Sequence, residues 1–229
     1  MMQPRESKTF VCFGKTGSGK STFVKAMGGD VPEDELEDIN GEAVTEEAEF
    51  YAINDGKDYL MDTPGFGDTR SDGVKFTNAV HKKCILEAFN RNKKTHFNGV
   101  FWFVTSGRAE AELHEEARFI QELGEFLESG SIWDHVLVML RYRTPATGVR
   151  RAIECLQSEQ PSSSDVRILS IGLKEDDYDP GSRCEVVISK NGLAISMEVG
   201  TKAFIMDFVF QKSPIKVSSV DSTTFRLQH

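Results

Sequence analysis

The sequence has no hydrophobic run long enough to cross a membrane. Its longest apolar runs, Val100–Val104 and Val136–Leu140, have the length of a buried strand, whereas a membrane-spanning helix needs about 20 apolar residues. The first residues, MMQPRESK, also lack the apolar segment of a secretory signal peptide. We therefore expect a protein with no transmembrane segment and place it in the cytoplasm.

Cysteines and histidines are few and widely spaced. None of the four cysteines belongs to a C-x-x-C pair, so their spacing fits neither a zinc site nor a disulfide framework, and reduced thiols are expected. Four of the histidines likewise share no spacing typical of metal ligands. The residues concerned are Cys12, Cys84, Cys155, Cys184, His81, His96, His114 and His135.

The chain has no excess of basic residues, and its net charge of −9 arises in one segment. Glu33–Glu49 holds nine acidic residues and no basic one, so the other 27 acidic residues balance the 27 lysines and arginines. Because an acidic segment repels a phosphate backbone, nucleic acid is not expected as a partner. We interpret the segment as a solvated loop, with a docking surface for a basic partner as the alternative.

Hydrophobic periodicity predicts alternating strands and helices up to about residue 171. Continuous apolar runs indicate buried strands, and the spacing of Leu113, Ala117 and Ile120 indicates an amphipathic helix. We expect strands at 8–13, 99–104, 136–140 and 166–171, and helices at 20–27, 74–91, 111–128 and 147–157. This alternation predicts an α/β fold with a mostly parallel central sheet and helices on both faces.

Two turn sequences predict β-hairpins. Asn54-Asp55-Gly56 lies between short strands at 50–53 and 59–61, and Asn191-Gly192 lies between strands at 185–189 and 194–199. No helical crossover follows about residue 172. We therefore divide the chain into a main domain at 1–172 and a β-rich C-terminal extension at 173–229, in which residues 203–210 fit either a strand or a short helix.

The segment Gly14–Ser21, GKTGSGKS, matches the phosphate-binding pattern G-x-x-x-x-G-K-[ST] between a predicted strand and a predicted helix. The glycines let backbone N–H groups converge on a β-phosphate, Lys20 reaches the β- and γ-phosphates, and the Ser21 hydroxyl binds Mg²⁺. We also assign Lys20 a catalytic role. The predicted nucleotide-binding residues are Gly14, Lys15, Thr16, Gly17, Ser18, Gly19, Lys20, Ser21 and Thr22. This motif makes the predicted fold a P-loop NTPase.

A second motif, YLMDTPG, follows the first predicted hairpin. An apolar strand that ends at Asp62 brings a carboxylate near the metal, where it typically acts through a bound water. Gly65 can offer its backbone N–H to a γ-phosphate. A D-x-x-G sequence alone is weak evidence, but it is strong when it ends a strand downstream of a P-loop.

Together, GKTGSGKST and DTPGFGDT resemble the septin-like GTPases, which include septins, immune-associated nucleotide-binding GTPases and chloroplast-envelope import GTPases. The P-loop resembles the immune-associated family, DTPGFGD is closer to septins, and residues 104–110 resemble a Gly-Arg-containing stretch of the immune-associated family. The resemblance covers about 8–140 and implies GTP and Mg²⁺ as ligands. It also implies that Thr45 is the switch threonine and a metal ligand.

The sequence departs from the usual GTPase pattern at three places. After the strand at 136–140, a guanine-specific GTPase should show [NT]-K-x-D, but Arg141–Thr144 offers no carboxylate. Ser170-Ile171-Gly172 resembles the final base-contacting loop only loosely. Phe66 stands where Ras-like proteins keep a catalytic glutamine, and an apolar side chain cannot orient water, so intrinsic hydrolysis should be slow or use a residue supplied from elsewhere.

Arg108 has two interpretations. A surface arginine is usually only solvated, but in the import GTPases a comparable arginine contacts the nucleotide of the partner subunit. The resemblance therefore implies a homodimer across the nucleotide face, with Arg108 acting in trans on catalysis.

The sequence as a whole predicts a GTP-binding switch with weak GTP hydrolysis. One alternative is an ATP-using P-loop protein, although no Leu-Ser-Gly-Gly-Gln signature of ABC ATPases is present and only one arginine cluster, at 141–151, could serve a kinase lid. The other alternative is an assembly scaffold that binds nucleotide without significant turnover.

Overall fold

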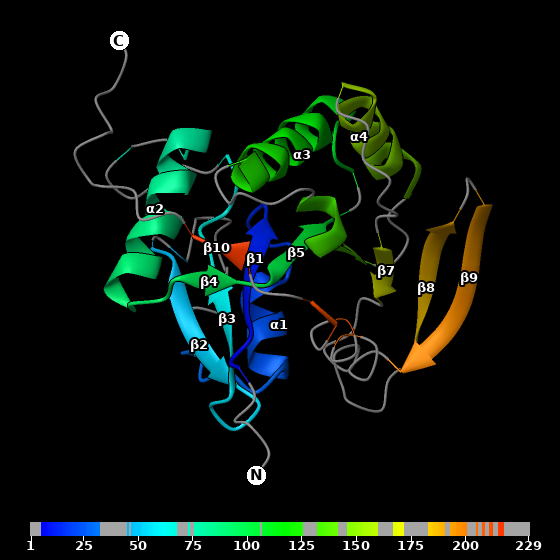
Figure 1. Cartoon of the computed structure of the whole chain (residues 1–229). Coiled ribbons are helices and arrows are strands. Elements are labelled where there is room, and N and C mark those ends of the chain that lie inside the picture. The colour runs from blue at the N-terminus through cyan, green and yellow to red at the C-terminus, as the bar shows by residue number, and fades with distance from the viewer. Residues whose placement is uncertain are drawn as a thin grey trace.

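The structure is a computed structural model of the whole chain (Figure 1). It describes residues 6–32, 45, 47–67, 73, 76–105, 107–125, 132–141, 146–159, 167–171, 183–190, 193–200, 205, 208, 211–212 and 215–217.

An eight-stranded sheet forms the centre of the fold, in the order β2-β3-β1-β5-β6-β7-β8-β9. Strands β3, β1, β5, β6 and β7 pair in parallel, whereas β2 runs antiparallel to β3 and the β8–β9 hairpin joins β7 antiparallel. The predicted, mostly parallel sheet is therefore confirmed. The strands are β1 (Thr9–Gly14), β2 (Glu49–Ile53), β3 (Asp58–Asp62), β5 (Gly99–Val104), β6 (Val136–Arg141), β7 (Arg167–Ile171), β8 (Arg183–Lys190) and β9 (Leu193–Gly200).

Four α-helices are described together with this sheet: α1 (Lys20–Ala26), α2 (Asn78–Arg91), α3 (Glu110–Glu125) and α4 (Ala146–Glu159). The helix predicted to begin at 74 begins at Asn78, because the Thr77 hydroxyl caps it by accepting a hydrogen bond from the Val80 N–H at 3.4 Å. The predicted end of the third helix at 128 lies outside the described residues. No helix in the described part of the chain is both long and apolar enough to cross a membrane.

Three short elements were not predicted. A 3₁₀ helix, η2 (Ile132–His135), precedes β6, and two strands of two residues each, β4 (His96–Phe97) and β10 (Ile215–Lys216), pair antiparallel. A two-residue strand leaves no periodic signal, so hydrophobic patterning misses it. The β4–β10 pair nonetheless ties the C-terminal part of the chain to the segment before β5.

Alternate residues of the central strands point to opposite faces of the sheet, and both faces are covered. Val11 and Phe13 of β1 belong to the core that packs against α2, α3 and α4, whereas Phe10 and Cys12 face the core that includes Phe23 of α1. Strands β5 and β6 alternate in the same way. Helices therefore lie on both faces, as predicted, with α1 on one face and the other three helices on the opposite face (Figure 1).

Both predicted hairpins are present. In the first, Asn54, Asp55 and Gly56 all have positive φ angles, of 52°, 56° and 76°, which fits the Asn-Asp-Gly turn between β2 and β3. The second hairpin, β8–β9, continues the main sheet through its pairing with β7. Of the segment 203–210, the structure describes Ile205 and Phe208, both helical and buried.

His81 of α2 lies in a cluster of aromatic side chains that includes Phe66, from the segment after β3. Its ring stacks on Phe66, with centroids 5.3 Å apart and planes at 21°, and it also contacts Phe13, Phe76 and Phe119. Burial and, to a smaller extent, the charge of Lys20 lower the pKa of His81 to about 4, although a hydrogen bond with the Gly65 backbone partly opposes the change. The imidazole is therefore neutral at physiological pH.

This neutral histidine should make the folded protein sensitive to acid. Below pH 6.5 the unfolded chain binds a proton at His81 that the folded chain accepts only near pH 4, so stability present above pH 6.5 is lost as the pH falls toward 4. The loss should reach about 3 kcal/mol. We expect His81→Leu to show a shallower decline in the free energy of unfolding between pH 7 and 4.5, measured by urea titration. Equal declines in both proteins would contradict this assignment.

Candidate functional site

The P-loop begins where β1 meets β5. A Cβ atom on Gly14 would lie 2.4 Å from the Phe103 carbonyl oxygen, and the φ angle of Gly14 is 147°, so only glycine fits there. Gly19, with φ of 97°, precedes the first residue of α1. The two glycines thus bend the chain sharply between β1 and α1.

Lys20 turns back over this loop. Its ammonium group donates hydrogen bonds to the carbonyl oxygens of Gly14 and Lys15, each at 3.1 Å, and the residue is only 6% exposed. These contacts hold the lysine charge inside the loop. The motif residues Thr16 and Gly19 are half-buried, Ser18 is buried, and Gly17 and Thr22 are exposed.

Ser21 and Asp62, two of the three residues predicted to bind the metal, are in direct contact. The Ser21 hydroxyl donates to Asp62 Oδ2 at 2.5 Å, and the Thr63 N–H donates to Asp62 Oδ1 at 3.0 Å. Burial raises the pKa of Asp62, and Lys20 together with these hydrogen bonds only partly offsets that rise. A hydroxyl and a carboxylate are oxygen donors of the kind that Mg²⁺ prefers, so the pair fits that ion.

The chain after Asp62 is attached to the P-loop. The Phe66 N–H donates to the Gly14 carbonyl oxygen at 3.1 Å, which places Gly65 beside the loop. The Phe66 side chain is only 8% exposed and packs on Phe13 and His81. The residue in the glutamine position therefore points into the core, away from any water above the P-loop.

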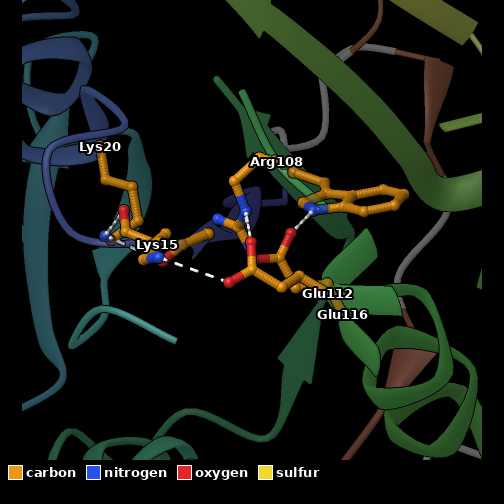
Figure 2. Close-up of polar contacts among 7 residues, drawn as sticks. Lys15, Lys20, Arg108, Glu112 and Glu116 are labelled. Atoms are coloured by element: carbon orange, nitrogen blue, oxygen red, sulfur yellow. Dashed lines mark hydrogen bonds and ion pairs between the residues drawn. The ribbon is translucent and has the colours of Figure 1, made fainter. Parts of the chain in front are cut away.

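Arg108 is not the solvated surface residue of the first interpretation. Its side chain is 7% exposed, because Arg108 Nε donates to Glu112 Oε2 at 2.8 Å and Nη2 donates to Glu116 Oε1. Glu116 is fully buried, and its Oε2 accepts a hydrogen bond from Trp102 Nε1 at 2.8 Å. Figure 2 shows Arg108 between the two P-loop lysines and these two glutamates.

The glutamates have opposite pKa shifts. Burial raises the pKa of Glu116, although Arg108, Trp102 and Lys20 act against the rise. The pKa of Glu112 is lowered overall: burial raises it, but the charges of Arg108 and Lys15, together with hydrogen bonds from the Arg108 side chain and the Ala109 backbone, outweigh burial. Glu112 Oε1 also lies 3.6 Å from the Lys15 ammonium, which connects the P-loop to Arg108.

Residues 9–140, more than half of the chain, match the family model described as 50S ribosome-binding GTPase. The chain belongs to this GTPase family. It therefore carries a GTP-binding P-loop GTPase domain.

Several solved GTPase structures are similar to this GTPase at low identity. A structure of the chloroplast translocon components atToc33 and psToc159, whose dimerization is described as important for GTPase activity, shares 15% identity over 73% of this chain and 70% of its own, with a TM-score of 0.44. Era from Aquifex aeolicus, bound to GDP and AlF4⁻, shares 15% over 73% of this chain and 52% of its own, with a TM-score of 0.42. A septin GTPase domain from Chlamydomonas reinhardtii shares 12% over 85% and 86%, with a TM-score of 0.35. No curated protein sequence matches significantly.

The other predicted residues of this GTPase are only partly placed. Thr45 is half-buried, and its role as a metal ligand stays a prediction. Arg141 and Ser170-Ile171 end the neighbouring strands β6 and β7, but 142–145 and Gly172 lie outside the described residues.

Sequence reasoning missed Glu112 and Glu116. They follow Arg108 at four-residue intervals, so all three lie along one side of α3 and the residues just before it. That spacing was visible in the sequence and could have indicated a side-chain cluster. The hydrogen bond between Trp102 and Glu116 joins β5 to α3. No sequence pattern within either element could have predicted it.

We expect Arg108→Ala to destabilise the GTPase strongly. The change leaves the buried Glu116 carboxylate without its cation, which costs about 3–5 kcal/mol. The pKa of Glu116 is already raised and rises further without Arg108. The loss of stability relative to the wild type is therefore greatest at neutral and alkaline pH, and it becomes smaller as the pH falls and Glu116 is protonated. The free energy of unfolding, measured by urea titration at pH 8 and pH 5, checks both the size and the sign.

Arg118→Ala is the matched control, because Arg118 is exposed on the same helix and its loss should change stability by no more than about 0.5 kcal/mol. Equal small effects from both substitutions would show that the Arg108 pair does not stabilise the fold.

Proposed function

We propose that this protein is a GTP-dependent switch of the septin-like type that binds Mg²⁺ and hydrolyses GTP slowly by itself. The observation that carries the proposal is the direct contact between its two nucleotide motifs. Ser21 donates to Asp62 at 2.5 Å, and the Phe66 N–H donates to Gly14 at 3.1 Å. The segment after Asp62 contacts the loop that would hold the phosphates. Loss of the γ-phosphate can therefore change the conformation of that segment.

Each predicted residue has a role in this proposal. Backbone N–H groups of Gly14–Ser21 surround the phosphates, Lys20 neutralises the charge that develops on the β- and γ-phosphates, and Gly65 offers its N–H to the γ-phosphate. Ser21, Thr45 and Asp62 would hold Mg²⁺, which supplies further charge stabilisation when bound. The septin-like type rests on the motifs GKTGSGKST and DTPGFGDT.

Slow hydrolysis follows from the place of Phe66. Its side chain packs on Phe13 and His81, so it cannot orient an attacking water, and an arginine supplied by a second copy would compensate. We also propose a cytoplasmic setting and a division into a G domain at 1–172 and an extension at 173–229, whose function we leave unassigned.

Lys20→Ala should abolish GTP binding. The substitution removes the buried ammonium group that lies in the loop, and the remaining lysine of the motif, Lys15, is partly exposed and paired with Glu112. Titration with a fluorescent GTP analogue measures the effect, and Lys25→Ala, an exposed lysine on the same helix, is the control. Unchanged affinity in Lys20→Ala would overturn the phosphate site.

The rate of GTP turnover per subunit should rise with protein concentration. An arginine supplied in trans can raise phosphoryl-transfer rates by about 10³–10⁵, and Arg108 could act in this way only after its contacts with Glu112 and Glu116 are loosened. Arg108→Lys keeps a cation beside Glu116 but lacks the guanidinium fork, so it should flatten the concentration dependence while GTP affinity stays nearly intact.

Turnover that is independent of concentration across the range where dimers form would rule out the action in trans. The same assay with ATP separates the alternatives: faster turnover of ATP would favour an ATP-using protein, and nucleotide binding without any turnover would favour an assembly scaffold.

A further inference from the structure

One carboxylate, that of Glu112, holds two cations that belong to different parts of the site. Its Oε2 accepts a hydrogen bond from Arg108 Nε at 2.8 Å, and its Oε1 lies 3.6 Å from the ammonium group of Lys15 in the P-loop. Glu112 is therefore the bridge by which the P-loop contacts Arg108 (Figure 2). The lowered pKa of Glu112 agrees with this double contact.

The two glutamates that hold Arg108 differ in their freedom to move. Glu116 is fully buried, and each of its oxygens already has a partner, Arg108 on one side and Trp102 on the other. The Glu112 side chain is 43% exposed, so it can turn to water at little cost. Glu116 is thus a fixed hydrogen-bond acceptor of Arg108, whereas Glu112 can break its contact with Arg108.

Arg108 itself is incompletely bonded. Its Nη1 atom is buried and has no hydrogen-bond partner within the described part of the chain, while Nε and Nη2 are occupied by the glutamates. Buried donors without a partner are rare in native proteins, and each needs an explanation. A guanidinium with a hydrogen bond from only two of its three nitrogen atoms, beside a phosphate-binding loop, fits a resting position rather than a final one.

Stability alone gives no reason for this buried pair. Replacing a buried ion pair with apolar residues of similar volume is often neutral or stabilising, and a role as a conformational switch is the best-attested use of such groups. The pair also lies at the start of α3, close enough to Lys20 for that lysine to influence the pKa of Glu116.

We propose that Glu112 is a positioning residue that couples the phosphates in the P-loop to the position of Arg108. This inference rests on the proposed GTP-dependent function. A γ-phosphate in the P-loop attracts Lys15 and Arg108 and repels the Glu112 carboxylate, so Glu112 turns outward and Arg108 loses one of its two anchors. The guanidinium is then able to turn its unpaired Nη1 arm toward phosphate, whether of its own subunit or of a second copy. The Glu116 carboxylate stays in place through Trp102.

Trp102 makes this rearrangement measurable, because its indole N–H is bonded to the carboxylate that Arg108 would partly leave. The chain has only two tryptophans, so Trp133→Phe leaves Trp102 as the single fluorescent reporter. In this parent protein, a non-hydrolysable GTP analogue with Mg²⁺ should change the emission of Trp102, and GDP should change it less.

In the Trp133→Phe background, Glu112→Gln should remove most of this nucleotide-dependent change, because the neutral amide is neither repelled by phosphate nor a strong anchor for Arg108. Glu115→Gln is the matched control: Glu115 is exposed on the same helix, loses the same charge, and should respond like the parent. If Glu112→Gln binds the GTP analogue and gives the full parental signal, the coupling is wrong.

A kinetic measurement in the wild-type background tests the same idea without the reporter. Glu112→Gln should raise the kcat for GTP by up to about fivefold, as expected for loss of a partly exposed ion pair, with little change in KM. The gain should vanish when Arg108→Lys is combined with it. An equal gain in the Arg108→Lys background would contradict a role that acts through Arg108, whereas a parent that binds no GTP would overturn the proposed function itself.

Discussion

The hydrogen bond from Ser21 to Asp62 is the contact on which the rest of the site depends. It joins the first residues of α1 to the last residue of β3, and so sets the relative position of the two motifs that we propose bind phosphate and metal. The contact exists because β1 pairs in parallel with both β3 and β5, which brings the carboxyl ends of these strands to one edge of the sheet. Parallel α/β sheets place their ligands at this edge.

Core residues next to this contact support it. Phe66 and His81 fill the space between β1 and the helices α2 and α3 with aromatic rings, and the Thr63 hydroxyl donates to the Cys12 carbonyl oxygen at 2.7 Å. The segment that would respond to nucleotide is therefore attached both to the sheet and to the core. Any movement of this segment must break aromatic contacts, which favours two discrete positions over gradual motion.

Much of this organisation was predictable because its causes are local. The apolar run at 99–104, the glycine pattern of Gly14–Ser21 and the turn at Asn54–Gly56 each carry their information within a few residues. The burial of Arg108 was not predictable in this way, because it depends on Glu116 meeting Trp102, and these residues come from different elements. The inward direction of Phe66 and the joining of β8 to β7 likewise depend on tertiary packing.

The close approach of Gly14 to β5 has a practical consequence. The residue that opens the phosphate loop is also a spacer between two central strands, since any side chain there would collide with the Phe103 carbonyl oxygen. At this position the proposed ligand recognition and the sheet geometry therefore depend on the same residue, so a change that alters one also alters the other. A substitution at Gly14 would both weaken nucleotide binding and displace β5, and an assay could not separate the two effects. Loss of binding is therefore better tested at residues whose side chains enter the loop without contacting a neighbouring strand.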